Sequence, residues 1–195
     1  MEVKTDRTLR QVRSCASRFT TRDDQGGPVI EGYFAVFNSD YEIWPGATEQ
    51  VAPEAFNNAL GGDIRALCDH DTRLVLGRTT AGTLSLKVDE RGLWGSIKIN
   101  EQDSDAMNLY ARVQRGDVSQ CSFGFDILDE EYKENPDGSC LWIIRDVFLY
   151  EVSVCTFPAY AETSVEARKN DRETQRRRAL ELRKNKLKER IAKWH

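Results

Sequence analysis

Histidine is nearly absent from this chain, because His70 and the terminal His195 are the two among 195 residues. An imidazole has an unperturbed pKa of about 6.5, which suits proton transfer near neutral pH. If the chain uses histidine for such chemistry, we therefore expect the base to be His70. The scarcity also argues against a histidine-rich metal site.

The sequence also lacks cysteine motifs and long apolar runs. No CxxC pair occurs. The five cysteines are odd in number and widely spaced: Cys15, Cys68, Cys121, Cys140 and Cys155. Such spacing favours reduced thiols over a disulfide framework or a zinc site, so we predict no metal and no cofactor. The first thirty residues are rich in arginine and lack an apolar run. We expect no signal peptide, no spanning helix and a cytosolic protein.

Charge divides the chain into an acidic body and a basic tail. Residues 166–195 carry 12 Lys/Arg against 5 Asp/Glu, a net of +7, which leaves residues 1–165 with 16 against 27, a net of −11. We predict an N-terminal polar segment (1–27), one domain (28–165) and a basic amphipathic tail (166–195). The apolar residues of the tail fall on one helical stripe: Leu180, Leu187, Ile191 and Trp194.

The body has the sequence pattern of a mainly β protein. β-Branched and aromatic residues recur in runs bounded by turn signals, at 29–37, 83–89, 93–99, 118–128 and 141–157, with NPDG (135–138) between the last two. Two short helices are predicted, at 53–60 with Pro53 first and at 104–115 with Asp103 or Ser104 as its cap. We expect these helices at the periphery of a sheet or barrel.

His70 stands in the run CDHD. If this run is a strand, Asp69 and Asp71 face away from the imidazole, because neighbouring side chains alternate between faces. The carboxylate that orients His70 would then come from elsewhere in the chain. A loop histidine hydrogen-bonded to the flanking aspartates is the simpler alternative.

The segment QCSFGFD (120–126) offers a nucleophile. Strand alternation puts Cys121, Phe123 and Phe125 on one face and Ser122 on the other, beside Gly124. This pattern anchors the strand in a core and leaves room for a substrate over the serine. A barrel strand with a glycine bulge and no catalytic role fits the same pattern.

Glu151 is a charged residue inside the apolar run YEVSVCTF, on the same strand face as Ser153 and Cys155. A buried carboxylate needs a partner, because an unpaired charge away from water is costly. An imidazolium from His70 would be such a partner. An outward-facing glutamate on an exposed strand is the alternative.

Several of these motifs together, in this order, resemble the tailed-phage prohead maturation proteases, which are serine peptidases distantly similar to herpesvirus assemblin. The resemblance rests on EGYFAVFN, VAPEAF, CDHDTRLVLGRT, TLSLKVDERGLWGSI, RGDVSQCSFGF and YEVSVCTFPAYAET, and it covers roughly residues 28–168. It implies a herpesvirus-protease-like antiparallel β-barrel with a few peripheral α-helices.

The resemblance also implies an activity. It makes His70 the base, Ser122 the nucleophile and Glu151 the third member of a catalytic triad for peptide-bond hydrolysis. The implied substrates are the phage major capsid protein and scaffold, cut inside the procapsid in the host cytoplasm, with self-cleavage and a homodimer as further expectations. The tail would then dock the body onto capsid or scaffold protein or be removed by self-cleavage, and a solvated surface helix is its plain alternative.

The chain departs from the herpesvirus pattern, in which the third triad member is a second histidine and nearby arginines form the oxyanion site. No arginine follows Glu151 before Arg168, so backbone N–H groups are the expected donors, with Arg145 as an electrostatic helper. Rival interpretations are a thiol peptidase using Cys121 or Cys68 and a non-catalytic capsid-associated or scaffold-associated binding protein. Nucleic-acid and membrane partners are not expected, because the body is acidic and lacks a spanning segment.

Overall fold

The structure is a computed structural model that describes residues 11–15, 19–24 and 27–157, and within the tail residues 172–174, 176–177, 180–181 and 183–184. The chain divides into two compact units, residues 9–160 and residues 1–8 with 161–195. The described tail residues are helical, while most of the predicted tail helix (166–195) lies outside the described residues. The following account concerns the first unit.

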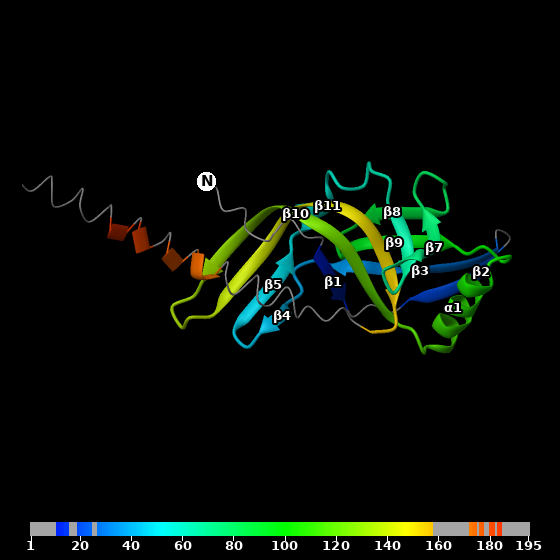
Figure 1. The fold of residues 1–195 in the computed structure, drawn as a ribbon, viewed down its shortest axis with the longest axis horizontal. Helices are drawn as coiled ribbons and strands as arrows, with labels where there is room; N and C mark the ends of the chain where they lie inside the picture. The colour runs from blue at the N-terminus through cyan, green and yellow to red at the C-terminus, as the bar shows by residue number, and fades with distance from the viewer. Residues whose placement is uncertain are drawn as a thin grey trace, which may run out of the picture. The chain divides into compact units, whose positions relative to one another are not determined.

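Two β-sheets form this unit (Figure 1). The path of the seven-stranded sheet runs through β1 (Gln11–Cys15), β10 (Gln120–Glu134), β11 (Cys140–Cys155), β5 (Ala47–Val51) and β4 (Tyr41–Trp44). Further along β11 the sheet continues through β6 (Arg65–Cys68) and β7 (Asp71–Arg78). The four-stranded sheet runs through β2 (Thr20–Asp24), β3 (Gly27–Val36), β9 (Gly92–Lys98) and β8 (Leu84–Val88).

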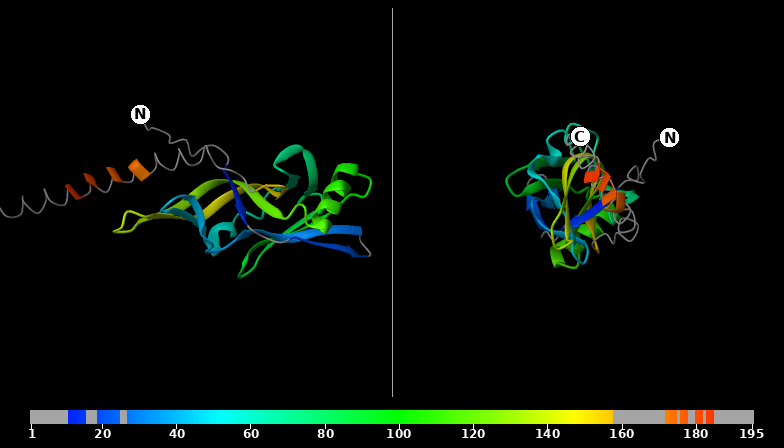
Figure 2. Two further views of the ribbon diagram at one scale, coloured as in Figure 1. Left: turned by 90° about the horizontal axis from the view of Figure 1, so that it is seen from below. Right: turned by 90° about the vertical axis from the view of Figure 1, so that its left-hand side faces the viewer.

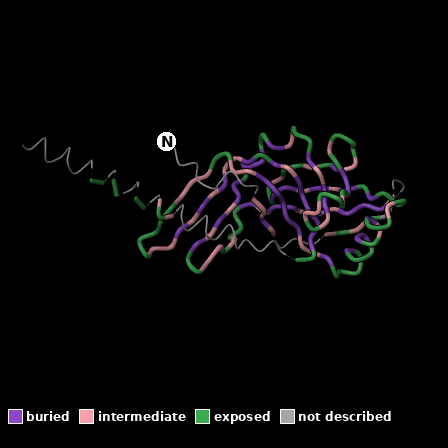
Figure 3. The backbone as a smooth tube through the Cα atoms, viewed as in Figure 1, coloured by how far each residue is buried: buried purple, intermediate pink, exposed green. Residues whose placement is uncertain are grey.

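The antiparallel hairpin of β10 and β11 is the longest pairing in the unit and crosses the core shared by both sheets. As the alternation predicted, the side chains of Cys121, Phe123 and Phe125 on β10 are buried in this core. The Phe123 and Phe125 rings stack with centroids 4.6 Å apart. The end of the hairpin away from its turn (121–125 and 151–155) is accordingly buried, whereas its turn end is exposed (Figure 3).

The prediction of a mainly β protein with few helices is confirmed, but no closed barrel is found among the described residues. The pairing is also not wholly antiparallel, because β11 runs parallel to β5 along Cys140–Ile144 and to β6 along Glu151–Val154. The two ends of the larger sheet are bridged by side chains. Arg13 of β1 forms an ion pair with Glu49 of β5 and lies over the ring of Tyr41 of β4.

The helix predicted at 104–115 is confirmed as α1 (Ser104–Arg115), which packs against β2, β3 and β7 (Figure 2). The Asp103 side chain caps its N-terminus, and Gly116 ends it at a φ of 88°, a left-handed conformation that glycine adopts without strain. The helix predicted at 53–60 is instead a 3₁₀ turn over Pro53–Phe56 followed by irregular turns. No described helix is long and apolar enough to cross a bilayer.

Two strands, β1 and β2, lie within the segment predicted as polar, 1–27. β1 pairs antiparallel with β10, and β2 pairs antiparallel with β3. Each sheet therefore takes one of its edge strands from this segment, and the described part of the segment belongs to the folded unit.

The cap of α1 can be tested by substitution. Asp103 accepts hydrogen bonds from the backbone N–H groups of Asp105 and Ala106 at 3.0 and 3.2 Å. We expect Asp103→Ala to lower the free energy of unfolding by about 1 kcal/mol, because these N–H groups lose their acceptor. Asp103→Asn keeps an acceptor and should stay close to wild type. Equal losses for the two variants in urea unfolding would contradict this role.

Candidate active site

His70 lies in a tight turn between β6 and β7 and not in a strand, so the strand assumption in the sequence analysis is wrong. Cys68 pairs with Asp71 across the turn, and the two residues between them have positive φ angles, 48° for Asp69 and 60° for His70. Two left-handed residues in a two-residue hairpin loop are typical of a type I′ turn. Aspartate and histidine are among the non-glycine residues that tolerate this region best.

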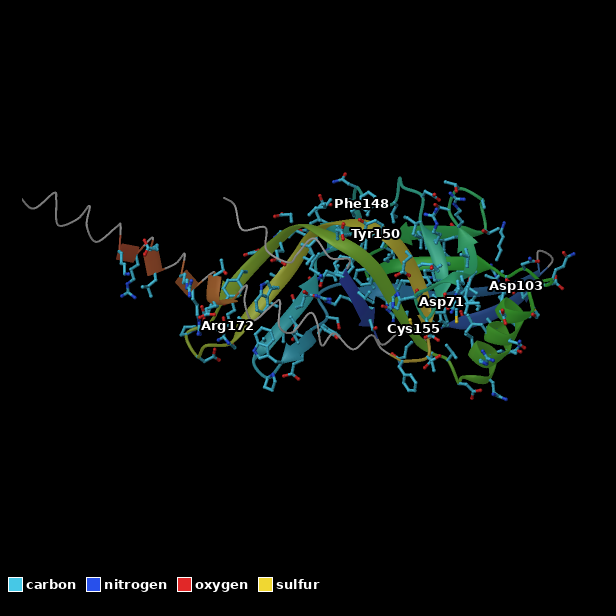
Figure 4. The ribbon with its side chains drawn as sticks, viewed as in Figure 1. Asp71, Asp103, Phe148, Tyr150, Cys155 and Arg172 are labelled. Carbon is cyan, nitrogen blue, oxygen red and sulfur yellow. The ribbon has the colours of Figure 1, made fainter. Side chains whose placement is uncertain are left out.

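The flanking aspartates both have partners away from His70. The Asp69 carboxylate accepts hydrogen bonds from the Thr156 backbone N–H at 2.7 Å and the Thr156 hydroxyl at 2.9 Å. Asp71 binds Arg73, whose guanidinium lowers the pKa of that carboxyl to about 2. Asp69 therefore links the turn to the end of β11 through hydrogen bonds. Asp71 stays ionised at the surface (Figure 4).

Glu151 is the carboxylate that contacts His70. Its Oε1 lies 2.7 Å from His70 Nδ1, and its side chain is 1% exposed against 25% for the imidazole. The Ser153 hydroxyl donates to Glu151 Oε2 at 2.5 Å and lies 3.3 Å from His70 Nδ1. The carboxylate is thus held from both oxygens, by the imidazole and by a serine.

A β-bulge lies next to Glu151. Gly124 pairs with Glu151, but Phe125 pairs with Leu149, which leaves Tyr150 as an extra residue on β11. A bulge bends its strand and changes the direction of neighbouring side chains. The Tyr150 hydroxyl donates to Asp126 at 2.5 Å on β10, and this hydrogen bond ties the bulged residue to the neighbouring strand.

Ser122 is fully buried on β10 and pairs with Ser153 on β11 and with Ser14 on β1. Residues directly opposite in antiparallel strands share a face, so Ser122 lies on the same face as Ser153 and Glu151. Its hydroxyl donates to the Arg13 carbonyl at 2.8 Å. Among the described residues, no hydrogen bond joins Ser122 to His70. The structure therefore brings His70 and Glu151 into contact and puts Ser122 one strand away.

The other nitrogen of the imidazole faces a cysteine. Cys155 Sγ lies 3.7 Å from His70 Nε2, and the residue is buried at the end of β11 (Figure 4). Burial raises the pKa of the Cys155 thiol, and the charges of Asp69 and Glu151 raise it further. Burial likewise raises the pKa of Cys68 to about 11. Both groups are therefore protonated thiols, and not thiolates, at neutral pH.

Two residues at the site, Ser153 and Cys155, were not assigned a role from the sequence. The signal that could have found them is strand alternation, because residues 151, 153 and 155 share one face. In contrast, Cys121 lies on the core face of β10, where its thiol contacts the Phe34 carbonyl. From this position Cys121 cannot reach His70.

Arg145 lies too far along β11 to act at the site. It is six residues from Glu151, which corresponds to about 20 Å in an extended strand. Its guanidinium is engaged by Glu54 and Glu131. Of the two kinds of oxyanion-site donor expected from the sequence, only backbone N–H groups are therefore left.

His70 and Glu151 are thus in contact, and Ser122 lies on the same sheet face on the neighbouring strand. A family model described as "Caudovirus prohead serine protease" matches residues 17–178. The chain therefore belongs to the caudovirus prohead serine protease family.

Individual relatives agree with this membership. The chain is 34% identical to the prohead protease of Enterobacteria phage HK97 over 160 residues, 78% of this chain and 64% of that protein. It is 32% identical to the prohead protease of Escherichia phage T5 over 142 residues, 72% of this chain and 62% of that protein. The chain thus spans a little under two thirds of either relative. Among solved structures, the bacteriophage T4 capsid assembly protease aligns with a TM-score of 0.48 and 9% identity, over 75% of this chain and 96% of that one.

The attachment of the His70 turn to β11 can be tested with its two flanking aspartates. We expect Asp69→Ala to lower the free energy of unfolding by about 1 kcal/mol or more, because both hydrogen bonds to Thr156 are lost and alanine is strained at the positive φ of this position. Asp71→Ala is the matched control. It should cause a smaller change in urea unfolding, because the contacts that it loses, with the guanidinium and the backbone N–H of Arg73, are exposed to solvent. A larger loss in the free energy of unfolding for Asp71→Ala than for Asp69→Ala would show that the hydrogen bonds to Thr156 do not hold the turn in place.

Proposed function

We propose that the chain is a serine endopeptidase of phage capsid maturation, with Ser122 as nucleophile, His70 as base and Glu151 as orienting carboxylate. The observation that carries this proposal is the 2.7 Å contact between buried Glu151 and His70 Nδ1. A carboxylate on Nδ1 selects the tautomer in which Nε2 is free to take a proton, and it stabilises the imidazolium that forms. Family membership supports the same class of reaction.

The reaction proceeds through an acyl-enzyme. Ser122 Oγ attacks the scissile carbonyl carbon, and His70 Nε2 takes the hydroxyl proton and returns it to the leaving amine. Water then hydrolyses the ester and restores Ser122. In the described state the Ser122 hydroxyl is engaged by the Arg13 carbonyl, so it must turn toward the imidazole first.

Neighbouring groups assist this arrangement. The Ser153 hydroxyl holds the second oxygen of Glu151 and so fixes the direction from which the carboxylate meets the imidazole. The Cys155 thiol beside Nε2 is protonated at neutral pH because burial raises its pKa, which makes it a poor nucleophile. The developing oxyanion is stabilised by backbone N–H groups, each of which can contribute about 3 kcal/mol in the transition state.

The natural substrates in this proposal are the scaffold and major capsid protein of the phage, cut inside the procapsid in the host cell. The names of the HK97 and T5 relatives, both prohead proteases, support this setting. Self-cleavage belongs to the same proposal. The homodimer expected from the resemblance stays a prediction.

The nucleophile can be identified with three variants. Ser122→Ala and His70→Ala should each lower cleavage of the co-expressed capsid protein by at least about 10³-fold, because either change stops acyl transfer. Cys155→Ala should keep most of the activity, since the thiol takes no part in bond breaking. Mass spectrometry of the fragments gives the measurement. Full cleavage by Ser122→Ala together with loss in Cys155→Ala would instead make this a thiol peptidase.

The role of Glu151 can be separated from its packing by an isosteric change. Glu151→Gln keeps the size of the side chain but removes the negative charge, so the imidazole loses its tautomer control and the stabilisation of its cation. We expect a loss of about 10³-fold to 10⁴-fold in the cleavage rate. Asp129→Asn, an exposed carboxylate on the same hairpin, is the control. An unchanged rate in Glu151→Gln would exclude Glu151 from the triad.

A further inference from the structure

A strand of this chain lies on the proposed nucleophile. β1 pairs antiparallel with the outer edge of β10, and Ser14 of β1 pairs with Ser122. The Ser122 hydroxyl donates to the carbonyl oxygen of the preceding residue, Arg13, at 2.8 Å. An extended peptide that adds a strand to a sheet edge is a common mode of peptide recognition. β1 therefore has the arrangement of a peptide bound with the Arg13–Ser14 bond at the nucleophile.

The side chain of Arg13 enters a site built for a cation. Its Nε and Nη2 atoms donate to the two carboxylate oxygens of Glu49, the latter at 3.0 Å. The guanidinium also lies 6.0 Å from the ring centroid of Tyr41 and 5.9 Å from that of Phe125. A two-pronged carboxylate contact flanked by aromatic rings favours a cationic side chain, and arginine fits it best.

The Arg13–Glu49 ion pair is buried. Arg13 is 3% exposed and Glu49 is 2% exposed. Both residues, with Tyr41, also line a cavity of about 280 Å³. Across the described residues, the buried polar and charged side chains are Arg13, Glu49, Ser122, Glu151 and Ser153. Each of them thus belongs to the proposed triad, to its support or to this pair.

A buried Glu49 discriminates strongly between the side chains that could enter. An apolar side chain would take two guanidinium hydrogen bonds away from a buried carboxylate, and an acidic one would add repulsion. A site built to bind a polar group rejects analogues that lack it by large factors. The residue that enters beside Glu49 must therefore carry a positive charge.

We propose that Glu49, with Tyr41 and Phe125, forms the subsite for the residue on the amino side of the cleaved bond, and that it selects arginine or lysine. This inference rests on the proposed serine-peptidase function. Arg13 occupies the subsite in the described state, so the Arg13–Ser14 bond of this chain is itself a substrate.

Cleavage at this bond follows the proposed chemistry. Ser122 Oγ bonds to the Arg13 carbonyl carbon, the C–N bond to Ser14 breaks, and the hydroxyl proton passes through His70 to the Ser14 nitrogen. Water then hydrolyses the Arg13 ester, which gives an Arg13 carboxylate and restores Ser122. The new chain begins at Ser14.

The test uses the full chain co-expressed with the phage capsid protein, with mass spectrometry of every new terminus. Wild type and Arg13→Lys should both give a chain that begins at Ser14, and Ser122→Ala should not. Arg13→Leu and Arg13→Glu should lower this cleavage at least about 100-fold, because Glu49 loses the guanidinium that it binds in the described state. Arg22→Leu, which changes an exposed arginine of β2, is the matched control and should be cut like wild type.

A charge reversal separates recognition from packing. In a Glu49→Lys chain the capsid fragments should end in Asp or Glu instead of Arg or Lys, and Arg13→Glu combined with Glu49→Lys should restore cleavage before Ser14. A structural role for the ion pair would not move the cleavage sites.

If Glu49 variants do not fold, the Arg13 variants decide the test. Equal cleavage of Arg13→Leu and wild type, or capsid fragments that end in uncharged residues, would overturn the subsite and leave the peptidase proposal intact. Capsid cleavage that persists in Ser122→Ala would overturn both.

Discussion

The register between β10 and β11 is the constraint on which the rest of the structure depends. It pairs Ser122 with Ser153 and Gly124 with Glu151, so the polar side chains share one face while the phenylalanines of β10 fill the core on the other. A slip by one residue would exchange the two faces, burying serine in the core and exposing phenylalanine. Hydrophobic burial and site geometry are therefore fixed by the same pairing, and neither can change without the other.

The sequence predicts those features of this arrangement that are set by residues close together in the chain. The two faces of β10 follow from alternation over a few residues, and α1 follows from its Asp103 cap and Gly116 end, so both were predictable. The turn at Asp69–His70 was missed because its two central residues include no glycine or asparagine, the usual signal for positive φ. The 3₁₀ turn at Pro53–Phe56 was predicted as an α-helix because a short apolar pattern does not distinguish the two conformations. Too few residues follow it to sustain growth of an α-helix.

Non-local pairings were beyond the sequence pattern. Nothing in the residues of β5 or β6 says that both run parallel to β11, and no local signal marks the polar residues of β1 as an edge strand. The contact between His70 and Glu151 joins residues 81 positions apart, and its geometry depends on the bulge at Tyr150. The sequence could nominate the two residues, because one was scarce and the other was a charge in an apolar run. Their 2.7 Å separation follows from the assembled sheet.

The distribution of buried charge links stability to function in this fold. A buried ion pair gives little net stability, because desolvation offsets most of the Coulombic attraction, and apolar residues of similar volume often serve as well. Arg13, Glu49 and Glu151 are nonetheless the buried charged side chains among the described residues, in a unit whose core is mainly apolar. Stability alone does not account for these buried charges. The proposed active site and subsite account for them, because Glu151 would hold an imidazole and Glu49 a cation, and a carboxylate acts most strongly on its partner where water is excluded.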